Sequence, residues 1–88
     1  MKQRFLDRFD ALPIGSFTGT ANGKRYRVTR LDFTQGRSQK LIAEEFGGND
    51  YISLNLYRLA SGSRLKPCEM PEAKVIAFVL DLTLDKTR

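Results

Sequence analysis

The sequence predicts a single α+β domain over residues 1–88, in which an antiparallel meander of four or five strands packs one face against N- and C-terminal helices. Three observations support this fold class. Apolar residues recur at helical spacing near both ends of the chain. An Asn-Gly pair joins two alternating segments, which is typical of a β-hairpin. The later strand-like segments follow one another through short turns, as in a meander. A chain of 88 residues suffices for one hydrophobic core.

A short amphipathic helix is predicted over about residues 2–12. Phe5, Phe9 and Leu12 recur at spacings of four and three, with Leu6 beside them, while charged residues occupy the other side. Pro13 ends this helix, because the residue before a proline avoids the helical region.

The segment around Asn22 and Gly23 carries the strongest local signal, because this pair readily adopts the positive φ angles of a type I′ turn. A two-residue turn pairs Thr20 with Arg25 and places Phe17 opposite Val28. Alternation of side chains then gives the hairpin two chemically distinct faces. One carries Phe17, Gly19, Tyr26 and Val28, and the other carries Ser16, Thr18, Thr20, Arg25, Arg27 and Thr29.

Beyond Thr29 the apolar alternation changes phase, which indicates a bulge or the end of the strand. Residues 39–46 and 50–59 are the third and fourth predicted strands. A tight turn between them predicts two cross-strand pairs on the face of Ile52, Leu41 with Leu56 and Ala43 with Leu54. Residues 64–68 form a fifth extended segment, in which Pro67 suits a sheet edge.

The last helix is predicted to begin with Pro71 as its first helical residue. Asp81 and Asp85 are expected on its solvated side, opposite an apolar stripe that faces the core. A second stripe, Ala73, Ala77, Leu80 and Leu84, repeats at spacings of four, three and four. It either packs on the N-terminal helix or forms a self-association surface, so monomer and homodimer both stay open. The predicted core is Phe5, Phe9, Leu12, Phe17, Val28, Leu41, Ile52, Leu54, Leu56, Val75, Phe78, Val79 and Leu82.

Histidine is absent and Cys68 is the single cysteine. The chain therefore lacks imidazole bases, Cys–His and Ser–His pairs and a ligand set for structural zinc, and it has no phosphate-binding glycine motif. We expect a non-enzymatic protein without cofactor or metal. No apolar run is long enough to span a membrane, and the absence of a secretory leader and of paired cysteines favours the cytoplasm.

Cys68 itself has two opposing readings. It precedes the predicted helix and lies two residues from Lys66, and both features favour a thiolate. The negative charges of Glu69 and Glu72 disfavour a thiolate, and the chain has no histidine base and no resolving cysteine. Because free cysteines are commonly buried, we expect an unreactive packing residue, with a thiol function as the alternative.

Positive charge is concentrated in residues 24–40, whose net charge of +5 equals that of the whole chain. Such a segment attracts phosphate backbones, and tyrosines on a neighbouring strand provide stacking surfaces for bases. The sequence therefore suggests a binding or regulatory module whose basic hairpin contacts an acidic partner, either nucleic acid or protein. The alternative is a charged strand face that is merely solvated. The candidate anion-binding residues are Thr18, Thr20, Lys24, Arg25, Arg27, Arg30, Arg37, Lys40, Tyr51 and Tyr57.

Residues 54–78, LNLYRLASGSRLKPCEMPEAKVIAF, contain a Leu-x-Pro-Cys-Glu-Met-Pro segment ahead of the last helix. In this part of the chain, about a quarter of its length, the protein resembles small uncharacterised bacterial proteins that carry a similar segment. The resemblance implies a bacterial cytoplasmic origin. It implies no activity, so no functional residues are carried over from it.

Overall fold

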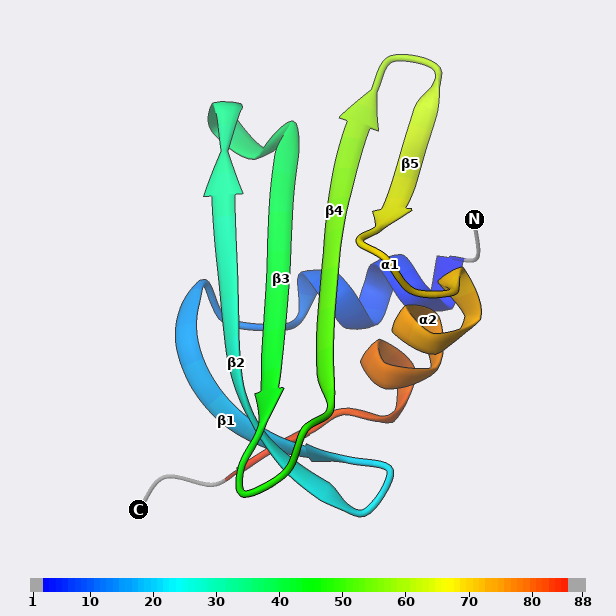
Figure 1. Cartoon of the computed structure of the whole chain (residues 1–88). Helices are drawn as coiled ribbons and strands as arrows, with labels where there is room; N and C mark the ends of the chain where they lie inside the picture. Colours follow the sequence, from blue (N-terminus) through cyan, green and yellow to red (C-terminus); the bar gives the residue numbers. More distant parts are fainter. Residues whose placement is uncertain (1–2, 86–88) are drawn as a thin grey trace.

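The computed structural model describes residues 3–85, which form a six-stranded antiparallel sheet with two α-helices packed on one of its faces (Figure 1). The strand order is β5-β4-β3-β2-β1-β6, so each strand from β1 to β5 lies beside its neighbour in the sequence. The predicted α+β meander with terminal helices is therefore confirmed. The elements are α1 (Gln3–Asp10), β1 (Gly15–Ala21), β2 (Lys24–Phe33), the 3₁₀ helix η1 (Thr34–Gly36), β3 (Ser38–Glu45), β4 (Tyr51–Leu59), β5 (Gly62–Pro67), α2 (Glu72–Asp81) and β6 (Thr83–Leu84).

The hairpin of β1 and β2 has the register predicted from its turn. Thr20 pairs with Arg25 and Phe17 with Val28. Asn22 and Gly23 have φ angles of 54° and 74°, the positive values that a type I′ turn requires. Turn chemistry therefore sets the register of this hairpin, and with it which side chains lie opposite one another.

The predicted bulge or strand end after Thr29 is wrong, because β2 continues in unbroken register as far as the pair Phe33–Ser38. The change of phase in the sequence has another cause. Arg30 occupies an inward position and is 5% exposed, whereas Leu31 and Phe33 point outward and are 37% and 48% exposed. The strand thus places a charged residue inside and apolar residues outside, the reverse of the usual pattern.

The register of β3 and β4 differs by two residues from the predicted one. Leu41 pairs with Leu54, and Ala43 pairs with Ile52, because residues 46–50 form a longer connection than a tight turn. A shift of two residues keeps every side chain on its predicted face. Pro67 ends β5, an edge strand, where its missing N–H costs no sheet hydrogen bond.

The end of the chain departs most from the prediction. Pro71 is extended and precedes the helix as its N-cap, so Glu72 is the first helical residue. The helix stops at Asp81, and Thr83–Leu84 turns back to pair with β1 as β6. Asp85 therefore lies beyond the helix and not on its solvated side. At the other end, α1 begins at Gln3, and Lys2 of its predicted range lies outside the described residues.

The core lies between the helices and the inward face of the sheet. All predicted core residues are buried except Phe17, which is partly buried and packs against them. Three further buried residues, Ala21, Tyr26 and Ala43, come from the same sheet face. No helix within residues 3–85 combines the length and the hydropathy needed to cross a membrane.

Candidate functional site

Both helices lie on one side of the sheet, and the described elements leave its opposite face uncovered (Figure 1). Alternation along β1–β5 places polar, basic and exposed apolar side chains there. At the hairpin end this outer face carries Thr18, Thr20, Arg25 and Arg27, as the sequence predicts. Tyr51 and Tyr57 of β4 lie on the same face, and so does Lys40 of β3.

Acidic side chains neutralise part of the hairpin end. The Arg25 guanidinium lies 2.6 Å from the Asp85 carboxylate and 5.6 Å from the centroid of the Phe46 ring. Hydrogen bonds from Arg25, Thr18 and Thr20 hold the pKa of Asp85 below its ordinary value. Since Arg27 pairs with Glu44 across the β2–β3 ladder, each arginine at this end has a carboxylate close by.

Three of the predicted anion-binding residues do not lie on the outer face. Arg30 is buried on the helix side, where its Nη1 donates to the Leu12 carbonyl at 2.5 Å and its guanidinium lies 4.6 Å from the Phe9 ring. Burial lowers the pKa of Arg30. The alternation of side chains along β2 also directs Lys24 to the helix side, where its positive charge contributes to lowering the pKa of Asp50. Arg37, exposed between η1 and β3, belongs to a loop and not to the face.

The remaining outer-face cations form a group with two aromatic rings, here called the aromatic–basic cluster: Phe33, Lys40, Tyr57, Arg64 and Lys66. Tyr57 pairs with Arg64 on one side and Ser38 on the other, and Ser38 pairs with Phe33. Lys40 and Lys66 both pair with Asn55, one step along the same row. Within residues 3–85 none of the three cations makes an ion pair.

The sequence prediction missed three members of this cluster. Arg64 and Lys66 fall in a segment that was expected to be extended but was not paired with a neighbouring strand. Phe33 was missed because β2 was expected to end or to bulge after Thr29. If the alternation that places Arg25 and Arg27 on the outer face continues through Leu31, it also places Phe33 there. The sequence pattern was therefore sufficient to predict Phe33.

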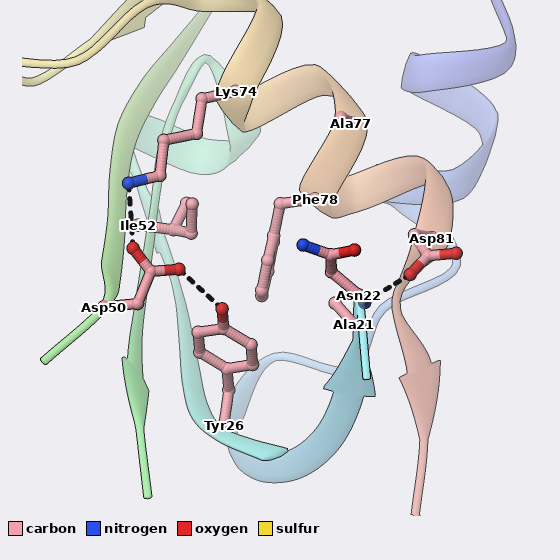
Figure 2. Close-up of a pocket in the computed structure, with 9 residues that line it drawn as sticks. All are labelled: Ala21, Asn22, Tyr26, Asp50, Ile52, Lys74, Ala77, Phe78 and Asp81. Atoms are coloured by element: carbon pink, nitrogen blue, oxygen red, sulfur yellow. Dashed lines mark hydrogen bonds and ion pairs between the residues drawn. The ribbon is translucent and has the colours of Figure 1, made fainter. Parts of the chain in front are cut away.

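A concave site lies on the helix side, between α2, the β1–β2 turn and the start of β4 (Figure 2). The Tyr26 hydroxyl donates to one Asp50 oxygen at 2.6 Å, and the Lys74 ammonium donates to the other at 2.8 Å. These bonds hold the pKa of Asp50 below its ordinary value of 3.8. Burial and the nearby Asp50 charge raise the pKa of Tyr26, so the phenol stays protonated at neutral pH.

Cys68 follows β5 directly and is half-buried. Its backbone N–H donates to the Ser53 carbonyl at 2.9 Å, and the Asn55 amide lies 3.5 Å from its sulfur. Both contacts tie the residue to β4. The expectation that it is an unreactive packing residue stays a prediction.

The proposed self-association stripe is not a single helix face. Ala73 and Ala77 are exposed on α2, and Leu80 is half-buried. Leu84 lies outside the helix, in β6, where it pairs with Gly19. The prediction that all four share one helical seam is therefore wrong, because the helix ends at Asp81.

Comparisons of the chain with protein-family models, with curated proteins and with solved structures gave no match. The resemblance of residues 54–78 to small bacterial proteins therefore stays a hypothesis.

Proposed function

We propose that the outer face of the sheet binds single-stranded nucleic acid. The observation that carries the proposal is the aromatic–basic cluster, in which cations that make no ion pair within residues 3–85 surround Tyr57 on an uncovered sheet face. Arg64 lies directly across from Tyr57, and Lys40 and Lys66 occupy the diagonal positions, which in antiparallel sheets are about 7–8 Å away. Phosphates can therefore contact cations on three sides of a base that stacks on Tyr57.

A single strand fits this surface better than a duplex does. Phe33 and Tyr57 lie in one row across the sheet, separated by β3, so their attachment points are about 10 Å apart. Two rings on an open sheet suit bases that are splayed apart, whereas stacked base pairs present no free face. The described helices lie on the other face, so neither is available here to enter a major groove.

The hairpin keeps a smaller part in this proposal than its charge suggests. Arg27 is exposed on the outer face, and Glu44 lies between it and Tyr51 in the same row of the sheet. Arg25 contributes less, because its guanidinium already pairs with Asp85. We therefore place the main binding site on β3–β5 and assign the hairpin a supporting role in phosphate attraction.

Fluorescence anisotropy of a labelled oligothymidine tests the proposal over a series of salt concentrations. Replacing Arg64 and Lys66 together with alanine should lower the log–log salt slope by about 1.4, since each phosphate contact on a single strand accounts for about 0.7. The matched control replaces Arg4 and Lys24, two exposed cations on the helix side. It removes the same charge and should change the slope little.

Stacking is tested separately at Tyr57. Tyr57→Leu should weaken binding by about 1–3 kcal/mol, the range for one base stacked on an aromatic side chain, whereas Tyr57→Phe should preserve it. Absence of salt-sensitive binding by the wild type at low ionic strength would eliminate the proposal and leave an acidic protein as the partner. Equal losses in the Arg64/Lys66 and Arg4/Lys24 variants would reduce it to non-specific attraction.

Self-association through α2 is the second candidate. Its support is the exposure of Ala73 and Ala77 on α2, which leaves small residues free for close helix packing. Sedimentation velocity at micromolar concentration decides it, and a monomer across that range removes the proposal.

A further inference from the structure

The cavity beside α2 lies on the opposite side of the sheet from the proposed nucleic-acid site and does not depend on it. Its volume is about 350 Å³, within the lower range of small-molecule sites. An apolar cavity of about 150 Å³ already admits benzene, so this one has room for a single ring with a short chain. Apolar side chains of Ala21, Ile52, Ala77 and Phe78 line much of it.

Two carboxylates lie in the same lining, and only one of them is neutralised. Figure 2 shows Phe78 projecting from α2 with the Tyr26–Asp50–Lys74 network on one side and Asn22 and Asp81 on the other. Lys74 balances the charge of Asp50 at 2.8 Å. Asp81 accepts only the backbone N–H of Asn22, at 2.5 Å. Within residues 3–85 no cation pairs with Asp81.

The helix itself adds to the negative potential at Asp81. This residue ends α2, and the last turn of the helix has no basic side chain. The carboxyl end of a helix carries a partial negative charge, which disfavours an acidic residue and favours a cation. Asp81 therefore adds a second negative charge where the helix already presents one, at the edge of an apolar cavity.

We propose that this cavity binds a small organic cation, a primary amine carried on an apolar body of about one ring. The apolar part lies against Ile52, Ala77 and Phe78. The ammonium group donates to the free oxygen of Asp81 and to the side-chain carbonyl of Asn22. An anion of the same shape is excluded, because it meets the Asp81 carboxylate and the helix end.

Titration with phenethylamine, followed by NMR amide shifts, tests this site directly. We expect saturable binding in the millimolar range, given the small size of the ligand, with the largest shifts at Asn22, Ala77 and Asp81. Phenylpropanoate, which replaces the amine by a carboxylate, should cause no saturable shift. Oligothymidine should not compete, so failure of this site and failure of the nucleic-acid site are distinguishable.

Two variants test the charge and the space of the cavity separately. Asp81→Asn retains an oxygen that can accept from Asn22, so the hairpin turn stays in place, but it should weaken amine binding by about fivefold or more because the charge-assisted bond is lost. Ala77→Leu fills the cavity from a helical position that tolerates leucine and should abolish binding. Asp7→Asn, an equal charge change on α1, is the control.

Three results would overturn the proposal. One is the absence of saturable shifts at the cavity residues with phenethylamine. Another is equal binding of phenylpropanoate, which would show that the carboxylate of Asp81 does not select charge. The third is an equal loss in Asp7→Asn and Asp81→Asn, which would make the effect one of net charge alone.

Discussion

Replacement of Arg30 by methionine should destabilise the fold without removing a binding residue. Arg30 sits between the sheet and the chain that follows α1, where it donates to the Leu12 carbonyl and lies over the Phe9 ring. It also lies 3.7 Å from the Asp10 carboxylate, which Arg58 contacts as well. One guanidinium thus fixes the end of α1 and the following turn to β2.

The expected loss follows from those contacts. A hydrogen bond from a charged donor contributes about 1.5–3 kcal/mol, and a desolvated cation–π contact adds up to about 2 kcal/mol. Methionine keeps apolar contact with Phe9 and avoids burying a charge, which offsets part of the loss. We expect a net decrease of about 2–3 kcal/mol in the free energy of unfolding, a large share of the stability of a small domain.

Urea and thermal unfolding followed by circular dichroism measure this change. For a domain of this size the melting temperature should fall by about 10–20 °C. Arg27→Met is the matched control, because it makes the same change on the outer face of the same strand and should cost about 0.5 kcal/mol or less. An Arg30→Met variant as stable as this control would refute the structural role of Arg30.

Three further outcomes are expected. Hydrogen bonds from Lys74 and Tyr26 lower the pKa of Asp50 in the folded protein. Asp50 therefore contributes stability that is present above its ordinary pKa of 3.8 and is lost as the pH falls through its folded pKa. The urea midpoint of Asp50→Asn should fall less at acid pH than that of the wild type, and parallel plots of midpoint against pH would contradict this. Cys68 should react slowly with a thiol reagent in the native protein and quickly in urea, and rapid native modification would revive a thiol function. Gly19→Val should lower the free energy of unfolding by about 1–3 kcal/mol. A Cβ at this position would lie 2.8 Å from the Leu82 side chain and 2.9 Å from the Thr83 carbonyl oxygen. Thr20→Val, on the outer face, is the control.

Local signals predicted most of the fold. The Asn22–Gly23 turn fixed the hairpin register because a two-residue turn admits one pairing, and helical spacing located α1 and α2. The β3–β4 register was missed because a five-residue connection carries no such constraint. Strand β6 was missed because Leu82 and Leu84 also fit a continued helical pattern, and only the tertiary contact with Gly19 shows where the helix ends.

The candidate site was harder to predict, since it depends on which face each charged residue occupies. Arg27 and Arg30 are three apart on one strand, so they point to opposite sides, and only Arg27 reaches solvent on the outer face. Tyr26 and Tyr57 differ in the same way, one buried under α2 and the other lying among cations. Residue type alone does not distinguish these cases.

A charge count by face, and not along the chain, therefore decides where an anion binds. The outer face of β1–β5 carries five cations, Arg25, Arg27, Lys40, Arg64 and Lys66. The one carboxylate of these strands on that face, Glu44, lies at the hairpin end, and so does Asp85, which follows β6. The excess charge consequently falls on β3–β5, beside Tyr57. Counterion release should then depend more on Arg64 and Lys66 than on Arg25 and Arg27, although the sequence places its densest run of cations in the hairpin.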